Sequence, residues 1–298
     1  MAAPLIDSLA AATQLGDYAL LDSGQGERLE RVGPYVLRRP ALQAVWRRDP
    51  AQPWDAADFA FARGATGYGD WTSARGKGPP RDGWGAVIHG LAVTLKLTAF
   101  GHLGLFPEMC GPWQFCAARL APAAAGPRRF LNLFAYTGLL SLAAARAGAE
   151  VAHVDAAKNT VDWARRNAAS SGLDAAKIRW LTDDAQKFVA RERRRGTTYH
   201  GLALDPPTYG RGAKKEVWQI EEHLAPLVED CAELLAEDAA FLLVTAHTPG
   251  LVGQGIANLL APVVARRGGR VDAGELLLAS HGDTKVLPSG SYAVWVAE

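Results

Sequence analysis

The spacing of hydrophobic residues divides the chain into two regions with different patterns. Between about residues 15 and 99, short apolar stretches alternate with turns. In Gly85–Leu97 apolar side chains recur at every second position, which predicts a long strand or a hairpin. Tyr35–Leu37 and 41–46 are shorter extended candidates. We therefore expect a small β-rich N-terminal module over residues 1–99, with substrate binding as a candidate role.

From Arg129 onward, buried apolar runs alternate with longer helical segments. The expected strands are 130–134, 151–154, 178–181, 202–204, 240–245, 274–279 and 292–296, and the expected helices are 139–147, 158–171, one ending at Arg194, 217–236 and 250–267. This alternation is typical of a doubly wound parallel sheet with right-handed crossovers. The last two strands lack a helix between them, which favours a closing antiparallel hairpin. We predict an α/β domain over 100–298, built on a mostly parallel seven-stranded sheet.

Composition and charge narrow the possible partners. The chain has 298 residues, of which 49% are hydrophobic and 21% charged, as in ordinary globular proteins. Its net charge of +1 means that a polyanion would need a local basic patch. No apolar run approaches the roughly 20 residues of a membrane span, and residues 1–14 make a poor signal peptide. We expect no membrane partner.

The cysteines suggest a reducing compartment. Cys110, Cys116 and Cys231 form neither a disulfide framework nor a CxxC pair. Reduced thiols and a cytoplasmic location are therefore expected. Because Cys and His do not cluster with ligand spacing, we expect no metal site.

The stretch Leu202–Tyr209 ends an apolar run with an acid, two prolines and an aromatic. Proline cannot continue a central strand, so the strand must end near Asp205. The Asp205 carboxylate then lies at the carboxyl edge of the sheet, where open α/β folds bind ligands. Such a turn suits an exocyclic amino group or the edge of a base, although an ordinary strand-to-loop turn gives the same pattern.

Further candidate residues follow the other predicted strands. Gly138 closes the turn after the first strand, Asp155 ends the second, and Asp183 and Asp184 end the third. Acids at successive strand ends outline a crevice of adenosine size. A dinucleotide site needs G-x-G-x-x-G, but the first turn of this chain has one glycine. A P-loop needs G-x-x-x-x-G-K-[ST], and this motif does not occur in the chain. A cofactor without phosphates fits better, while helix N-capping is the alternative for each acid.

These elements in this order resemble the class I S-adenosylmethionine-dependent methyltransferases, especially the bacterial ribosomal-RNA large-subunit methyltransferase group. The resemblance rests on Phe130–Gly138, Val154-Asp155, Asn167, Asp184-Ala185 and Asp205-Pro206-Pro207. His102–Glu108 is similar to a segment that precedes the methyltransferase core in that group. The resemblance covers residues 100–246, and it implies a Rossmann-like methyltransferase fold with S-adenosylmethionine as the cofactor.

The resemblance also implies roles for individual residues. Phe134, Tyr136 and Gly138, with Thr137 in the same turn, are expected along the methionine side of the cofactor. Asp155 is expected at the ribose, and Asp184, beside Asp183, at the adenine. Lys158 is expected near the ribose, with a solvated helix face as the alternative.

The same resemblance assigns catalysis to Asp205, Pro206, Pro207 and Tyr209. In amino-methyltransferases, the carboxylate and the first proline carbonyl accept the amino hydrogens, and an aromatic stacks on the base. In that pattern the aromatic directly follows the second proline, whereas here Thr208 takes that place and Tyr209 comes one residue later.

The carbon-5 cytosine route requires a cysteine nucleophile, in the proline turn or after the fifth strand. Residues 246–249 after that strand read Ala-His-Thr-Pro, and neither place has a cysteine. We therefore predict a methyltransferase acting on a base in RNA, with ribosomal RNA foremost. A small-molecule or protein substrate and a non-catalytic S-adenosylmethionine-binding module are the alternatives.

Three further features of the sequence carry candidate residues. Tyr68, Trp71 and Trp84 are interleaved with Arg75, Lys77 and Arg81, and such a segment can stack bases and meet phosphates. The alternative is a loop whose tryptophans pack onto the sheet. A basic loop at Arg211, Lys214 and Lys215 is a further candidate for phosphate contact. His247 and His281 are candidate bases or structural histidines.

Overall fold

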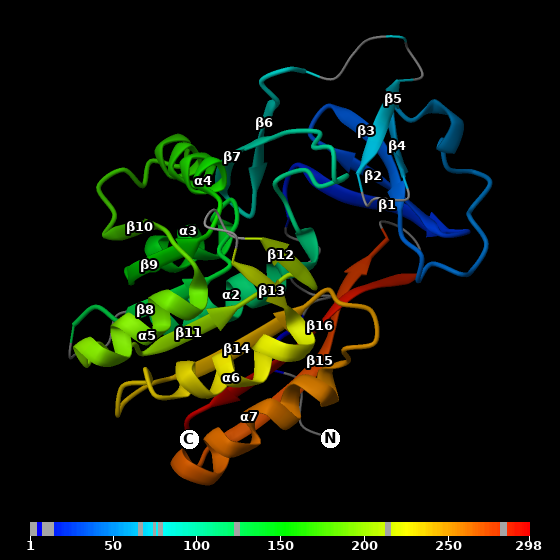
Figure 1. The fold of residues 1–298 in the computed structure, drawn as a ribbon. Coiled ribbons are helices and arrows are strands. Elements are labelled where there is room, and N and C mark those ends of the chain that lie inside the picture. The colour runs from blue at the N-terminus through cyan, green and yellow to red at the C-terminus, as the bar shows by residue number, and fades with distance from the viewer. Residues whose placement is uncertain are drawn as a thin grey trace. The chain divides into compact units, whose positions relative to one another are not determined.

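The computed structural model describes residues 5–7, 15–64, 68–73, 76, 80–121, 126–211, 216–280 and 285–298. The chain forms two compact units (Figure 1). The α/β unit comprises Met1–Asp7, Pro112–Leu276 and Gly290–Glu298. The β unit comprises Ser8–Gly111 together with Leu277–Ser289.

A seven-stranded sheet forms the centre of the α/β unit, in the order β10-β9-β8-β11-β14-β16-β15. The strands are β8 (Arg129–Leu133), β9 (Glu150–Asp155), β10 (Ile178–Thr182), β11 (Gly201–Leu204), β14 (Phe241–Ala246), β15 (Arg270–Ala279) and β16 (Val286–Val296). The first five run parallel, and β16 is antiparallel to β14. The predicted doubly wound, mostly parallel fold is confirmed.

The helices are α2 (Cys110–Leu120), α3 (Leu139–Arg146), α4 (Lys158–Ser170), α5 (Ala185–Arg195), α6 (Ile220–Ala232) and α7 (Gly253–Arg267), with the 3₁₀ turns η1 (Trp54–Ala56) and η2 (Pro107–Met109). Among the described residues, no helix is both long enough and apolar enough to cross a membrane.

The predicted helix over 217–236 was wrong at its start. Val217–Gln219 form β13, which pairs antiparallel with β12 (Tyr209–Arg211), and α6 begins at Ile220. Trp218 is buried while Val217 is exposed, so the local period is that of a strand. Pairing with the nearby strand β12 overrode the helical pattern.

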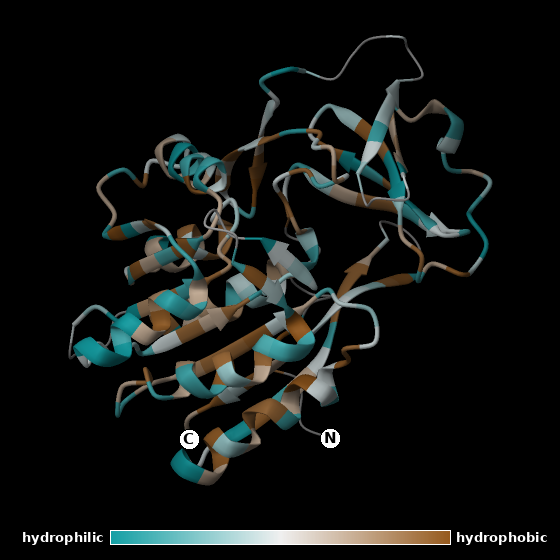
Figure 2. Ribbon diagram, in the orientation of Figure 1, coloured by the Kyte–Doolittle hydropathy of each residue, from teal (hydrophilic) through white to brown (hydrophobic). Residues whose placement is uncertain are grey.

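The central strands are buried on both faces, which places their carboxyl ends on a rigid base. β11 and β14 are buried along their whole length, and β14 is mostly hydrophobic (Figure 2), with Thr245 as its polar residue. On one face, Leu131 and Leu133 pack in a core with side chains of α5, α6 and α7. On the other, the Phe130 and Phe241 rings are 6.0 Å apart, and Phe115 of α2 meets Phe241 at 5.3 Å.

The β unit contains a five-stranded sheet in the order β1 (Tyr18–Gly24), β2 (Glu27–Val32), β3 (Tyr35–Pro40), β4 (Phe59–Arg63) and β5 (Gly69–Ser73). Only the β3–β4 pair among them is parallel. The predicted hairpin is confirmed as β6 (Trp84–Ile88) and β7 (Leu91–Leu95). It turns at His89 and Gly90, whose positive φ angles of 49° and 71° suit a two-residue hairpin turn.

The expected extended segment at 41–46 was wrong. These residues form turns and irregular backbone. The carbonyls of Ala44 and Trp46 accept hydrogen bonds from Gly26 N and Gln25 N, in the turn between β1 and β2. These carbonyl groups therefore hydrogen-bond to a turn and not to a neighbouring strand.

A buried ion pair lies inside the β unit. Arg39 donates from Nε and Nη2 to the two Glu30 carboxylate oxygens, at 2.7 Å each, and Tyr18 Oη donates at 2.8 Å. Burial alone raises the Glu30 pKa, but Arg28, Arg39 and the hydrogen bonds outweigh it and lower the pKa from 4.5 to about 2. The carboxylate is thus held ionised in a dry site.

We predict that Arg39→Met destabilises the protein by roughly 3–5 kcal/mol, because it leaves the buried Glu30 charge without its main partner. The control Arg38→Met removes a half-exposed arginine that pairs with Glu27 at 3.4 Å, and it should cost about 1 kcal/mol or less. Urea denaturation at pH 7 measures both. Equal losses in the two variants would contradict the assigned role of the buried pair.

The same cluster predicts an acid-dependent loss of stability. Since the folded Glu30 pKa is lowered, its contribution is complete above about pH 4.5 and is lost as the pH falls toward about 2. Wild-type stability should drop across this window, and Arg39→Met should reduce the drop. Urea midpoints between pH 5 and about 2 test this expectation.

Candidate functional site

The loop after β8 has an unusual backbone. Phe134, Tyr136 and Gly138 have positive φ angles of 55°, 49° and 92°. A Cβ at Gly138 would lie 2.9 Å from the Ala164 Cβ, so the turn passes directly against α4. Non-glycine residues with positive φ are uncommon, and they persist where the surroundings hold them.

Asp155 at the end of β9 holds this loop in place. Its Oδ2 accepts a hydrogen bond from Tyr136 N and its Oδ1 one from Ala157 N, both at 2.9 Å. Burial raises the Asp155 pKa, and the two backbone hydrogen bonds offset this only in part. Each carboxylate oxygen has a second lone pair, so the group still has acceptor capacity for ligand hydroxyls.

A buried polar network supports the loop from below. Asn167 of α4 donates from Nδ2 to the Thr137 carbonyl at 3.0 Å. Ser141 Oγ lies 2.9 Å from Asn132 Nδ2 and 3.0 Å from His153 Nδ1. Burial lowers the His153 pKa to about 3, so this histidine is neutral at physiological pH. These buried hydrogen bonds hold the loop from below, although His153 Nε2 is buried without a hydrogen-bond partner among the described residues.

The acids after β10 take part in local structure. Asp184 is the N-cap of α5, and its Oδ1 accepts from Lys187 N at 2.9 Å. Asp183 accepts from Asp184 N at 3.0 Å and pairs with Arg191. Asp183 N also donates to the Asp155 carbonyl at 3.0 Å, which joins this strand end to the preceding one.

Lys158 lies on the exposed face of α4, where Nζ pairs with Asp162 at 2.6 Å. It makes the one-turn helix ion pair that the solvated-face alternative describes. This contact agrees with the solvated-face alternative. The expected place of Lys158 near the ribose stays a prediction.

Asp205 follows β11, as the proline turn predicts. Its Oδ1 accepts from Thr245 Oγ1 at 2.7 Å and lies 3.3 Å from His247 Nδ1. Burial raises the Asp205 pKa, but His247 and then Thr245 outweigh it, and the net pKa is lower than usual. An ionised acceptor at neutral pH is thus held at the strand end.

Trp218 joins the proline turn to the loop after β8. Its Nε1 donates to the Pro207 carbonyl at 2.7 Å, and its ring lies 4.8 Å from the Phe134 ring. The sequence placed Trp218 on a helix, so this contact was missed. Val217 and Trp218 are both apolar, so the sequence itself carried no alternation that would have marked this strand.

The rest of the turn faces solvent. Tyr209 is 52% exposed, and its hydroxyl accepts from Arg211 Nε at 2.9 Å. Thr208 Oγ1 lies 2.8 Å from Thr248 Oγ1, which ties the turn to the segment after β14. Lys214, Lys215 and His281 lie outside the described residues.

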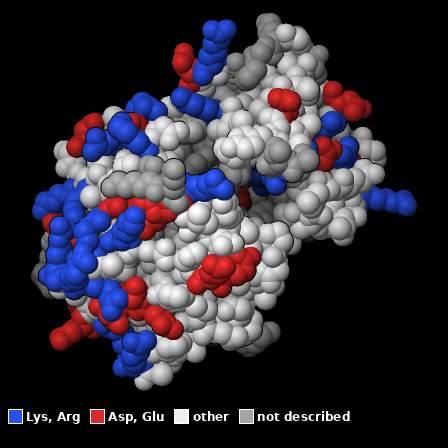
Figure 3. All heavy atoms as spheres, viewed as in Figure 1, with Lys and Arg blue, Asp and Glu red and all other residues white. Residues whose placement is uncertain are grey.

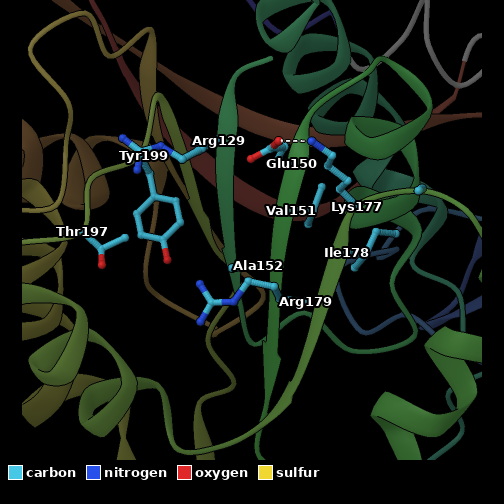
Figure 4. A pocket seen from close by; sticks show the side chains of 10 residues that line it. Arg129, Glu150, Val151, Ala152, Lys177, Ile178, Arg179, Thr197 and Tyr199 are labelled. Carbon is cyan, nitrogen blue, oxygen red and sulfur yellow. Dashed lines mark hydrogen bonds and ion pairs between the residues drawn. The ribbon is translucent and has the colours of Figure 1, made fainter. Parts of the chain in front are cut away.

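A pocket of about 440 Å³ lies at the opposite ends of the strands (Figure 4). Its lining includes Arg129, Glu150, Lys177, Arg179, Thr197 and Tyr199, from the beginnings of β8, β9 and β10 and the approach to β11. The candidate residues gather at the carboxyl ends instead, where α/β folds bind ligands. In the described part of the chain, no three His, Cys, Asp or Glu side chains group to hold a metal ion.

We predict that Gly138→Ala destabilises the protein more than the matched variant Gly172→Ala. Both glycines have positive φ, 92° and 68°, but a Cβ at Gly172 has no atom within 4 Å. Gly172→Ala should cost about 1 kcal/mol from backbone conformation, and Gly138→Ala about 1–3 kcal/mol more from crowding. Urea denaturation of both variants measures the difference, and equal losses would show that the close approach is relieved without cost.

Comparisons with known proteins identify the family and support the fold. A family model described as S-adenosylmethionine-dependent methyltransferase matches residues 63–250. A crystal structure of the SAM-dependent methyltransferase from Agrobacterium tumefaciens is 38% identical, with a TM-score of 0.90, and the match covers 95% of this chain and 91% of that one. A putative methyltransferase from Streptococcus mutans shows the same fold at 16% identity, with a TM-score of 0.71 and coverage of 99% and 82%.

Curated relatives match over shorter segments. Ribosomal RNA large subunit methyltransferase K of Neisseria meningitidis is 30% identical over 122 residues, 40% of this chain and 34% of that protein. Ribosomal RNA large subunit methyltransferase I of Aeromonas hydrophila is 37% identical over 83 residues, 28% and 21% of the two chains. The matches thus span about a third or less of these relatives. Because the family model covers more than half of the chain, this protein belongs to the S-adenosylmethionine-dependent methyltransferases and uses S-adenosylmethionine as its cofactor.

Proposed function

We propose that this enzyme methylates a base in RNA, ribosomal RNA foremost, and that the acceptor is an exocyclic amino nitrogen. The observation that carries the proposal is the ionised Asp205 carboxylate beside Pro206, at the carboxyl end of β11. Trp218 links this turn to the loop that ends at Gly138. The names of the curated relatives support RNA as the substrate.

The residues at the strand ends fit the cofactor. We assign the left-handed loop Phe134–Gly138 to its methionine side, because the glycine permits close approach of a ligand to the backbone. We assign Asp155 to the ribose hydroxyls and Asp184 to the adenine amino group. When bound, S-adenosylmethionine supplies a methyl group on a sulfonium that carries its own leaving group.

For methyl transfer, the protein must aim the acceptor nitrogen along the line of displacement. We assign the Asp205 carboxylate and the Pro206 carbonyl as acceptors for the two amino hydrogens, which points the nitrogen lone pair toward the methyl group. Because the Asp205 pKa is low, this carboxylate holds the amine by hydrogen bonding and does not remove its proton beforehand. Tyr209 is exposed and available to stack on the base.

The cysteines disfavour the covalent carbon-5 route. Cys110, Cys116 and Cys231 are all buried, and none forms a disulfide bond. Burial raises the pKa of each thiol, to about 12 for Cys110, so none is a ready thiolate nucleophile. A cytoplasmic location stays a prediction.

The surface offers local positive charge despite the near-neutral total. Lys and Arg side chains gather over the part of the α/β unit that carries α4 and α5 (Figure 3). The last turn of α5 contributes Arg193, Arg194 and Arg195. Arg193 pairs with Asp230 and Glu233 and Arg195 with Glu192, so the other Lys and Arg side chains of the patch are the ones that would attract a polyanion locally.

Asp205→Asn tests the proposed function. We expect methyl transfer to ribosomal RNA to fall by about 100-fold or more, because an amide presents an NH₂ donor where the amine needs an acceptor. Affinity for S-adenosylmethionine should change little. The measurement follows radiolabelled methyl groups into ribosomal RNA from cells lacking this protein, with calorimetry for the cofactor.

The control is Asp174→Asn, an exposed aspartate outside the site, which should behave as wild type. Full activity in Asp205→Asn would refute the role of Asp205. Labelling of small molecules or proteins, with none of RNA, would refute the substrate class.

His247→Gln should move the acidic limit of activity to higher pH. Wild-type activity needs ionised Asp205, so it should fall only as the pH drops through the lowered Asp205 pKa, below the ordinary value of 3.8. Without the His247 charge the Asp205 pKa rises, and the limit should rise by about one pH unit. Profiles of kcat/KM against pH measure this shift. The control His200→Gln, at the other end of the strands, should leave the pH profile unchanged. An unshifted profile in His247→Gln would show that the His247 charge does not lower the Asp205 pKa.

A further inference from the structure

A row of aromatic rings lies on the β unit, made by Tyr68, Phe100, His102 and Phe106. Ring centroids are 4.5 Å apart for Tyr68–Phe100, 6.4 Å for Phe100–His102 and 5.1 Å for His102–Phe106. Tyr68 is 55% exposed and Phe100 48%. Two neighbouring rings of this size are thus open to solvent at one end of the row.

The other aromatics of this region are held inside the β unit. Trp71 donates from Nε1 to the Thr98 carbonyl at 2.8 Å, and its ring lies 5.2 Å from that of Phe61. Trp84 is buried, and its Nε1 donates to the Val32 carbonyl at 3.2 Å. Both tryptophans follow the alternative of packing onto the sheet, which leaves Tyr68 as the exposed member of the predicted set.

Positive charge adjoins the row. Arg63 ends β4 opposite Gly69, and Gly64 N donates to the Tyr68 carbonyl at 2.7 Å, so Arg63 lies close to Tyr68 along the chain pairing. Arg63 is exposed, and no ion pair is found for it within the described residues. Burial first, and then Arg39, Arg63 and Arg28, lower the His102 pKa to about 4, against the opposing effect of Glu108. Arg63 is thus close enough to His102 to act on it electrostatically.

We propose that the aromatic row binds single-stranded RNA, with bases stacked on Tyr68 and Phe100 and a backbone phosphate at Arg63. This inference rests on the proposed RNA substrate and names a surface that contacts it. Bases of any sequence stack on aromatic faces, and a nearby arginine supplies the phosphate contact. Exposed rings beside an arginine outside any observed ion pair match this chemistry, because the charge complements a polyanion.

The test measures binding of fluorescein-labelled oligouridine of 12 nucleotides by anisotropy at several salt concentrations. Tyr68→Ala and Phe100→Ala should each weaken binding by about 5- to 100-fold, the range for losing one stacked base. The slope of log affinity against log salt should not change in these variants. Arg63→Gln should instead make the slope shallower by about 0.7, since one phosphate contact is lost.

Matched variants separate stacking from general effects. Tyr68→Phe keeps the ring and should bind as wild type. Leu42→Ala and Arg47→Gln remove an exposed apolar side chain and an exposed arginine elsewhere in the β unit, and both should leave affinity and slope unchanged. Because these positions lie in the β unit, far-UV circular dichroism and urea denaturation are used to confirm that each variant is folded.

The outcomes distinguish this inference from the proposed function. Wild-type methylation of RNA, together with unchanged oligouridine affinity in Tyr68→Ala and Phe100→Ala, would overturn the aromatic row alone. A wild-type dimer that these variants dissociate, with RNA affinity intact, would identify a second copy as the occupant and also overturn it. Wild-type protein that neither binds nor methylates RNA would overturn both.

Discussion

The site depends on the carboxylate of Asp155, which joins two strand ends of the central sheet. It accepts backbone hydrogen bonds from Tyr136 in the loop after β8 and from Ala157 after β9. Left-handed φ angles at Phe134 and Tyr136 cost energy, and they persist only where several contacts over-determine them. Burial of the carboxylate, seen in its raised pKa, is the cost of this arrangement.

A second set of contacts extends from this loop along the carboxyl edge of the sheet. The Phe134 ring meets Trp218, Trp218 holds the Pro207 carbonyl, and Asp205 is fixed by Thr245 and His247. Because β11 and β14 are wholly buried, the edge has a rigid base. The two loops are thus coupled through one indole, so a change at Trp218 acts on both.

Local signals explain what the sequence could predict. Proline and glycine act on the backbone locally, so Pro206 marks the end of β11 and Gly138 marks the start of α3 from the sequence alone. The acids at the strand ends could therefore be predicted without the structure. The contacts of Trp218 depend on pairing of β12 with β13, and those of residues 41–46 on a distant turn. The return of residues 277–289 to the β unit likewise has no local signal. Tertiary pairing decides such elements, and no short pattern records it.

The charge of the chain bears on how it would hold RNA. Some of its surface cations are paired with acids, as Lys177 is with Glu150 and Arg193 with Asp230, and such paired cations are less able to release counterions from a phosphate backbone. An enzyme of net charge +1 must therefore draw more of its affinity from contacts that salt does not screen. Stacking on exposed rings is such a contact, because it depends on apolar area and π-faces instead of charge. Tyr68 and Phe100 on the β unit, and Tyr209 beside the proline turn, are the exposed rings that suit this demand.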